Sequence, residues 1–189
     1  MFASNGSQAT ELQRRICNAS YAFRQLHPVL QARRGPSLQT KMLMYKTFVF
    51  PVLTYGGPET WALSAQQLQS LETAHNTFLR RITHQRRGPD GISNLDLYQL
   101  TYTASLAHQL EDRRLRRLGH IVRRGDGALV KQLLFASGLP HVVRPVGRPR
   151  RQWMDGAQRS LSRLGLLDSW LTLAENRDGW SKVCARVFD

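Results

Sequence analysis

The sequence predicts an all-α protein with, at most, a vestigial strand at its N-terminus. Three observations support this fold class. Apolar residues recur every three or four positions over most of the chain, which places them on one face of a helix. Serine residues that can cap a helix N-terminus stand directly before two of these segments. After the first few residues, no segment shows the alternation of apolar and polar residues that marks a half-buried strand.

The first helix is predicted from an apolar face whose members are spaced by four, three, four and three residues. They are Leu12, Ile16, Ala19, Phe23 and Leu26. His27–Pro28 would end this helix, because the residue before a proline is disfavoured in helical conformation. Asn5–Gly6 precedes the helix and is a turn signal that usually joins two extended segments. Almost no chain stands before this pair, so only a vestigial strand is expected.

Two further helices are predicted in the first half of the chain. Ser37 can cap the second helix, and Pro51 should kink or end it. Its apolar residues are Leu38, Met42, Tyr45, Phe48 or Val49, and Val52. Ser64 opens the third helix, with Gln67 as its partner in a capping box. Its face consists of Leu68, Leu71, His75, Phe78 and Ile82.

The second half of the chain is predicted to be helical and basic. Residues 86–94 form a loop by composition, and a long helix follows from about Thr103 to Arg124, ended by Gly125. The buried side of this helix would carry Leu110, Leu118 and Ile121. A short helix over 128–136 precedes a linker at 138–151, which contains three prolines and two glycines. Two amphipathic helices close the chain, near 153–164 and 169–188.

The charge of the chain points to a polyanionic partner. The formal net charge is +14, and 23 arginines stand against four lysines. Charge of one sign opposes compaction of the chain, and arginine binds phosphate through two hydrogen bonds and stacks on bases, which lysine does not do. GC-rich codons are an alternative explanation for the preference for arginine over lysine, but they do not explain the net charge.

The sequence contains none of the usual catalytic patterns. The adjacent acidic pair Glu111–Asp112 stands beside four arginines, and this predicts a salt-bridged helix surface rather than a two-metal site. The P-loop and the zinc-protease and serine-hydrolase motifs are missing, so no cofactor and no enzymatic activity are expected. Cys17 and Cys184 form neither a zinc knuckle nor a disulfide framework. The longest apolar run, Phe48–Leu53, is too short to span a bilayer, and a nuclear or cytoplasmic location is expected, with the nucleus favoured.

The candidate functional residues are therefore basic ones that can contact nucleic acid. They are Arg80, Arg81, Arg113, Arg114, Arg116, Arg117, His120, Arg148, Arg150 and Arg151. For each arginine the alternative is a solvated surface side chain, and for His120 it is a half-buried helix histidine. Consecutive arginine pairs cannot all lie on one helix face, so some must face solvent or a partner. The four tryptophans could stack on bases, but their apolar neighbours favour packing in the core.

The segment "VGRPRRQW" at 146–153 allows two interpretations. An AT-hook has an Arg-Gly-Arg-Pro core that lies in the minor groove, and here Val146 stands in place of the first arginine. The alternative is a basic linker whose Arg148, Arg150 and Arg151 contact phosphates without reading sequence, and this interpretation is the more economical.

The order of motifs along the chain resembles the C-terminal part of non-LTR (LINE-type) retrotransposon reverse transcriptases. The most specific piece is "SLQTKMLMYKTFVFPVLTYGGPETWAL". The other matching pieces, in the order of the family, are "SNGSQATELQRRICNASYAFRQL" before it and "LETAHNTFLRRI", "ISNLDL", "RRLRRLGHIVR", "GRPRRQWMDG" and "AENRDGWSKV" after it.

This resemblance implies a division of the chain and a role for it. Residues 1–87 are similar to the thumb, a helical subdomain that holds the template–primer duplex. Residues 88–137 resemble a basic helical extension, 138–152 a linker and 153–189 a C-terminal helical pair. The catalytic palm, with its aromatic-Asp-Asp motif, would lie upstream of Met1, and the implied partners are RNA, DNA or an RNA–DNA hybrid, together with such a palm. Two other interpretations stay open, namely a decayed open reading frame and a domesticated helical module that binds another protein.

Overall fold

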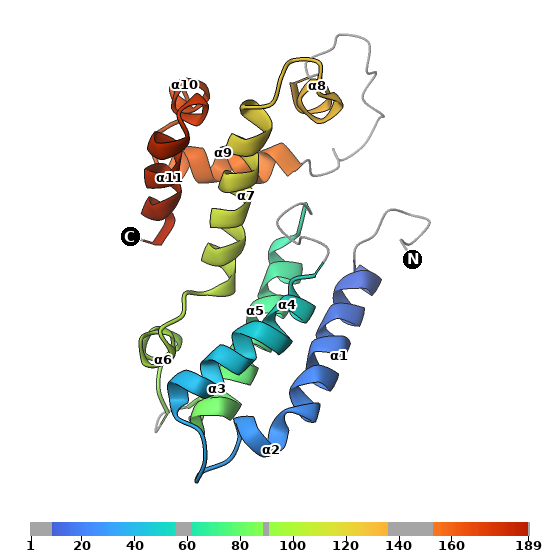
Figure 1. Ribbon diagram of the computed structural model, residues 1–189, viewed down its shortest axis with the longest axis vertical. Helices are drawn as coiled ribbons and strands as arrows, with labels where there is room; N and C mark the ends of the chain where they lie inside the picture. Colours follow the sequence, from blue (N-terminus) through green and yellow to red (C-terminus); the bar gives the residue numbers. More distant parts are fainter. Residues whose placement is uncertain (1–8, 56–61, 89–90, 136–152, 189) are drawn as a thin grey trace. The chain divides into compact units, whose positions relative to one another are not determined.

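The computed structural model describes residues 9–55, 62–88, 91–135 and 153–188, and these residues form two compact units. Of the described residues, the first unit contains 9–55, 63–88 and 91–107, and the second contains 62, 108–135 and 153–188. Helices make up the regular structure of both units, and the described ranges contain no strand (Figure 1). The all-α class is therefore confirmed. The vestigial strand and the linker at 138–152 were predicted for segments outside the described residues.

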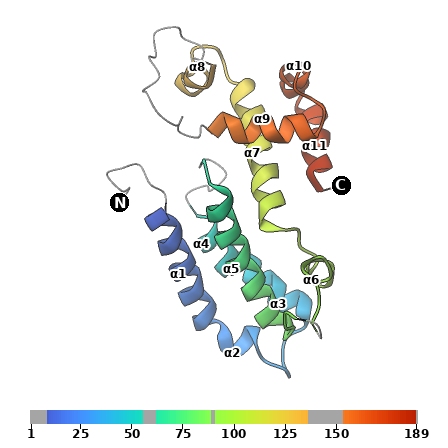
Figure 2. The same cartoon turned by 180° about the vertical axis from the view of Figure 1, so that it is seen from behind.

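The first unit is a bundle built around the two longest helices of its sequence, α1 (Ala9–Gln25) and α5 (Ala65–Thr83). Between them in the chain come α2 (His27–Leu30), α3 (Leu38–Met44), a π-helical segment η1 (Tyr45–Val49) and α4 (Phe50–Leu53). The helix α1 packs against η1, α4 and α5, and the two views in Figures 1 and 2 show α1 and α5 side by side.

The core of this bundle consists of the helix faces that the sequence predicts. Phe23 of α1 stacks on Phe78 of α5, with ring centroids 4.9 Å apart. The other buried residues of the predicted faces are Leu12, Ala19, Met42, Tyr45, Val49, Leu71, His75 and Ile82. Between the two candidates for one position, Val49 is buried and Phe48 is exposed. Ile16, Leu26, Leu38, Val52 and Leu68 are only half-buried because they lie at the margins of these faces.

Side-chain caps define the helix starts as predicted. The Ser37 hydroxyl accepts a hydrogen bond from the Thr40 backbone N–H at 3.2 Å. Ser64 and Gln67 form a reciprocal capping box, with distances of 3.1 and 2.8 Å. Pro51 cannot donate a backbone hydrogen bond, and the chain accommodates it with the π-helical turn η1 before the short α4, which ends at Leu53.

Two helices of the first unit were not predicted from the sequence, namely the four-residue α2, which has Pro28 in its first turn, and α6. The helix α6 (Asn94–Thr101) begins at the last residue of the predicted loop. Ser93 and Asp96 form a second capping box, in which Asp96 N donates to the Ser93 hydroxyl at 3.1 Å and Ser93 N donates to the Asp96 carboxylate at 3.2 Å. This serine and acid pair at the capping-box spacing was the signal for α6.

Glu72 of α5 connects three helices through its carboxylate. It accepts hydrogen bonds from the backbone N–H groups of Leu106 and Ala107, at 3.0 and 2.8 Å, and from the Tyr98 hydroxyl at 2.6 Å. Leu106 and Ala107 are the first two residues of α7 (Leu106–Val122), so a negative charge satisfies backbone donors at a helix N-terminus. This cap sets the start of α7 three residues after the predicted start at Thr103.

The buried His75 predicts that the stability of the first unit depends on pH. His75 is fully buried, and its Nδ1 lies 2.7 Å from the Tyr45 hydroxyl. Burial lowers the pKa of His75 to about 4, because the apolar surroundings disfavour the charged imidazolium. In the unfolded chain the pKa of histidine is about 6.5.

We expect acid to destabilise the first unit through this residue. Above pH 6.5 both states hold a neutral imidazole, whereas between pH 6.5 and 4 only the unfolded state takes up the proton. The free energy of unfolding should therefore fall by up to about 3 kcal/mol across this window. Urea unfolding of the parent and of His75→Gln at pH 7.5 and 4.5 measures the effect. An equal loss in both proteins would assign it to other groups.

Among its described residues, the second unit contains α7 from His108 onward and four further helices. They are α8 (Leu129–Phe135), α9 (Trp153–Arg163), α10 (Trp170–Glu175) and α11 (Arg177–Ala185), and a 3₁₀ turn (Arg186–Phe188) follows α11. The helix α9 crosses α7 in both views (Figures 1 and 2). The core contains Leu115, Leu118, Val122, Ala157, Leu161, Ala174, Trp180, Val183, Cys184 and Val187. Leu110, Leu118 and Ile121, the predicted buried side of α7, are buried.

The single helix predicted for 169–188 is wrong, because Asn176 divides it. Asn176 has a non-helical backbone, with φ −85° and ψ 113°, and separates α10 from α11. Its side-chain oxygen accepts hydrogen bonds from the N–H groups of Asp178 and Gly179 at 3.0 and 3.1 Å, which makes it the N-cap of α11.

Trp180 joins α11 to α7. Its side chain is 2% exposed, and its indole Nε1 donates to the Leu115 carbonyl at 2.8 Å. The ring lies against Gly119, where a Cβ atom would stand only 2.3 Å from two ring atoms. Only glycine leaves room for this ring, and this explains the Gly119 that precedes His120.

Candidate nucleic-acid interface

A row of basic side chains runs along α7, on the side away from the core of the second unit. Its members are Arg113, Arg117 and His120 of α7 and Arg124, which lies two residues beyond the end of the helix; they are here named the basic stripe. Arg117, His120 and Arg124 are exposed, and Arg113 is half-buried. The opposite side of α7 carries Leu115, Leu118 and Val122, which are buried. The helical members Arg113 and His120 are separated by about 10 Å along the helix axis.

The two acidic residues of α7 form ion pairs with arginines outside this stripe. Glu111 pairs with Arg163 of α9, with Nη2 and Oε2 2.6 Å apart, and Asp112 pairs with Arg116 at 2.8 Å. The hydrogen bond to the Asp112 carboxylate raises the pKa of Arg116, so this guanidinium stays charged while it is paired with Asp112. Both carboxylates therefore belong to ion pairs with arginines outside the stripe. This confirms the prediction that Glu111 and Asp112 form a salt-bridged helix surface.

The structure separates the arginines that the sequence grouped together on α7. Arg117 and the half-buried Arg113 lie on the stripe, and Arg116 lies beside it in its ion pair. The half-buried Arg114 turns toward α9, where its guanidinium occupies the space that a side chain at Gly156 would fill. The hydrogen bond from Arg124 Nε to His120 Nε2, at 3.3 Å, joins two members of the stripe.

Arg80 organises the loop that follows α5. Its Nη1 donates to the carbonyls of Arg86 and Ile92, both at 3.0 Å, and its Nη2 donates to the Asn94 side chain at 2.8 Å. Three of its donors are therefore committed to the chain itself. The neighbouring Arg81 is exposed, and no ion pair is found for it within the described ranges.

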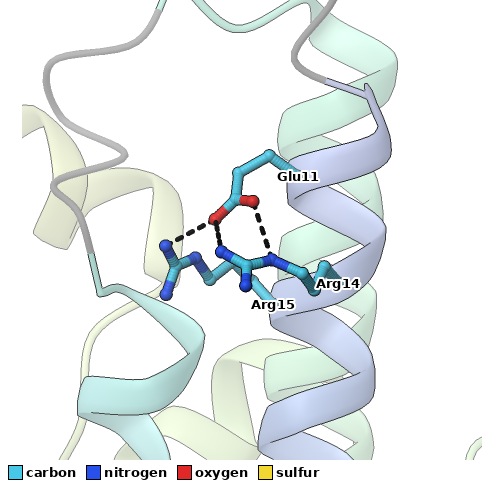
Figure 3. Close-up of polar contacts among 3 residues, drawn as sticks. All are labelled: Glu11, Arg14 and Arg15. Atoms are coloured by element: carbon cyan, nitrogen blue, oxygen red, sulfur yellow. Dashed lines mark hydrogen bonds and ion pairs between the residues drawn. The ribbon is translucent and has the colours of Figure 1, made fainter. Parts of the chain in front are cut away.

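Two arginines of α1, Arg14 and Arg15, form ion pairs with the buried carboxylate of Glu11 in the same helix. Glu11 is 8% exposed and binds Arg14 through two hydrogen bonds, of 2.8 and 2.9 Å, and Arg15 through an ion pair of 2.5 Å. Figure 3 shows both guanidinium groups turned toward this carboxylate. The hydrogen bonds from Arg14 hold the pKa of Glu11 below its usual value, and Arg15 also lies 4.8 Å from the centre of the Tyr55 ring. This cluster ties α1 to the turn after α4.

The structure describes only some of the remaining candidate residues. Arg148, Arg150 and Arg151 lie outside the described residues, so the choice between an AT-hook and a basic linker stays a prediction. Trp180 confirms the expected core packing, and Trp153 and Trp170 are half-buried. Within the described ranges, no group of histidine, cysteine or acidic side chains could hold a metal ion, and no helix is long and apolar enough to cross a membrane.

The sequence analysis missed Arg124 as a member of the stripe. The signal was present, because positions 113, 117, 120 and 124 share the period of a helix face. The adjacent arginine pairs do not reveal this period, because the two members of a pair point about 100° apart on a helix and only one of them can lie on the stripe.

Comparison of the chain with protein-family models, with curated proteins and with solved structures finds no match.

Proposed function

We propose that this chain is a nucleic-acid-binding part of a non-LTR retrotransposon reverse transcriptase. It would bind template–primer RNA–DNA hybrid or duplex DNA through backbone phosphates, with little choice of sequence. The aromatic-Asp-Asp motif of a catalytic palm is absent from these 189 residues, and we propose that they act together with a palm rather than as a polymerase themselves. We place this function in the nucleus, where a retroelement meets its DNA target.

The observation that carries the proposal is the basic stripe on α7. Arg113, Arg117 and His120 follow one face of α7, and Arg124 lies just beyond its end. The two acids of the same helix form ion pairs with other arginines. A row of this kind fits a line of phosphates, because each arginine can donate two parallel hydrogen bonds to one phosphate group. The net charge of +14 adds long-range attraction to a polyanion.

We expect Arg117→Gln/Arg124→Gln to weaken binding to an RNA–DNA hybrid and to lower its salt dependence. Each lost phosphate contact on duplex DNA reduces the slope of log affinity against log salt by about 0.9, and a reduction of this order is expected for each arginine. Titrations of a labelled hybrid by fluorescence anisotropy at several salt concentrations measure both effects.

The matched control for this experiment is Arg24→Gln/Arg33→Gln, which removes the same charge from two exposed positions of the first unit. If the control lowers the slope as much as the stripe variant, bulk charge rather than the stripe binds the hybrid. If the parent does not bind the hybrid at all, the proposed function is wrong.

One observation favours the alternative of a protein-interaction module. A groove in the first unit, about 370 Å³ in volume, is lined by residues of α3, η1 and the end of α6, both apolar and polar. Leu43 and Tyr102 at this groove are 65% and 82% exposed. Failure of the hybrid titration would make this groove the leading candidate site.

A further inference from the structure

An apolar pocket lies beside the basic stripe in the second unit. Its volume is about 320 Å³, and its lining residues come from α7, α8 and α9: Arg117, Ile121, Val130, Leu133, Leu134 and Trp153. The walls are aliphatic, with one indole ring, and the guanidinium-bearing side chain belongs to a member of the stripe. The pocket and the stripe therefore share Arg117.

The α8 wall of this pocket is open to solvent. None of the described residues of α8 is fully buried, and Val130 and Leu133 are 43% and 64% exposed. Large apolar side chains at the mouth of a pocket and beside a row of cations are costly to leave in water, and they favour a ligand with an apolar face and a negative charge close to it.

We propose that this pocket receives an unpaired nucleobase from a strand whose phosphates lie along the basic stripe. This inference rests on the proposed function and adds to it an unpaired, single-stranded segment of the template or primer as a ligand. A nucleobase offers a flat face to the indole of Trp153 and to the guanidinium of Arg117, and its own phosphate stays within reach of the stripe. In a duplex the bases are stacked inside the helix, so a base can enter only from an unpaired segment.

The charge of the site favours this occupant over an apolar protein segment. A purely apolar segment on the pocket would cover Arg117 without giving it an acidic partner, and this would cost free energy. The acids of α7 cannot supply that partner, because Glu111 and Asp112 pair with Arg163 and Arg116. A nucleic-acid strand brings both the apolar face and the anion.

The test compares an oligothymidylate strand with an abasic strand of the same length, each about 16 nucleotides long, in binding to the full chain. The two strands have the same phosphates and differ in their bases. We expect the parent to bind the thymidylate strand at least about fivefold more tightly, since stacking of one base on an aromatic ring is worth this factor or more.

Two variants of α8 locate the effect. Leu133→Gln places an amide in the pocket wall, whereas Leu129→Gln makes the same change at a position that is equally exposed, at 67% against 64%, and does not line the pocket. Leu133→Gln should bind the thymidylate strand only as tightly as the parent binds the abasic strand. Leu129→Gln should keep the parent's preference. Circular dichroism of both variants verifies that α8 and the fold are retained.

Several results would overturn the inference. Equal affinity of the parent for the two strands would show that bases do not enter a pocket, and the proposed function would stand on its phosphate contacts. A preference that survives Leu133→Gln, or that Leu129→Gln also abolishes, would place base binding elsewhere. Absence of binding to both strands and to the RNA–DNA hybrid would instead reject the proposed function itself.

Discussion

Gly119→Ala is expected to lower the free energy of unfolding of the second unit by about 2–3 kcal/mol. The new methyl group would stand 2.3 Å from the Cδ1 and Nε1 atoms of Trp180 and 3.0 Å from an Arg123 nitrogen. Overpacking of this kind costs about 1–3 kcal/mol, because a buried ring has no free space into which to move. The guanidinium of Arg123 is also held, since it donates to the Ala174 carbonyl at 2.6 Å.

Two further effects contribute to the net change in the free energy of unfolding. Displacement of the indole would break its hydrogen bond to the Leu115 carbonyl, which leaves a buried N–H donor without a partner at a cost of about 1–3 kcal/mol. Alanine in place of glycine within a helix contributes about 1 kcal/mol in the opposite direction. The steric and hydrogen-bond losses together exceed this gain.

Gly156→Ala is the matched control, because Gly156 is also inside a helix. Its added methyl group would meet only the flexible end of Arg114, at 3.2 Å, so this variant should be neutral or slightly more stable. Urea unfolding of both variants gives the comparison. In a Trp180→Ala background the cost of Gly119→Ala should disappear, and a cost that persists there would disprove the proposed clash.

The helices of the first unit could be predicted from local patterns because their causes are local. The face of α1 follows from residue spacing alone, and the capping boxes require partners only three residues apart. The same rule would have found α6 through Ser93 and Asp96. Asn176 is different, because it interrupts an amphipathic pattern that continues on both sides, and only its side-chain hydrogen bonds to the following turn show the break.

The partners of individual arginines could not be predicted from the sequence. Their number and charge indicate a polyanionic partner, but the roles of individual side chains depend on groups far away in the chain. Arg163 pairs with Glu111 across 52 residues, and Arg123 donates to a carbonyl 51 residues away. Arg80 binds oxygens of the loop after its own helix. No periodicity in the sequence indicates these partners. Only the structure therefore distinguishes the arginines that bind other parts of the chain from those that are exposed.

Phe23→Asp should unfold the first unit or lower its free energy of unfolding by at least about 4 kcal/mol. Phe23 is 1% exposed and stacks on Phe78, so its removal loses about 3–5 kcal/mol of packing. The new carboxylate would also be buried among apolar side chains, where it could remain only at the cost of several kcal/mol or by taking up a proton.

Tyr21→Asp on the same helix separates this effect from helix propensity and charge. Tyr21 is 61% exposed, so the same change from an aromatic ring to a carboxylate should cost less than about 1 kcal/mol there. Ile16→Asp should lie between the two, because Ile16 is half-buried at the margin of the face. Thermal and urea unfolding should therefore rank the variants as Tyr21→Asp, Ile16→Asp and Phe23→Asp in order of increasing damage. If Phe23→Asp melted with Tyr21→Asp, the packing of α1 against α5 would have to be rejected, since depth of burial is the only property in which these two positions of α1 differ strongly.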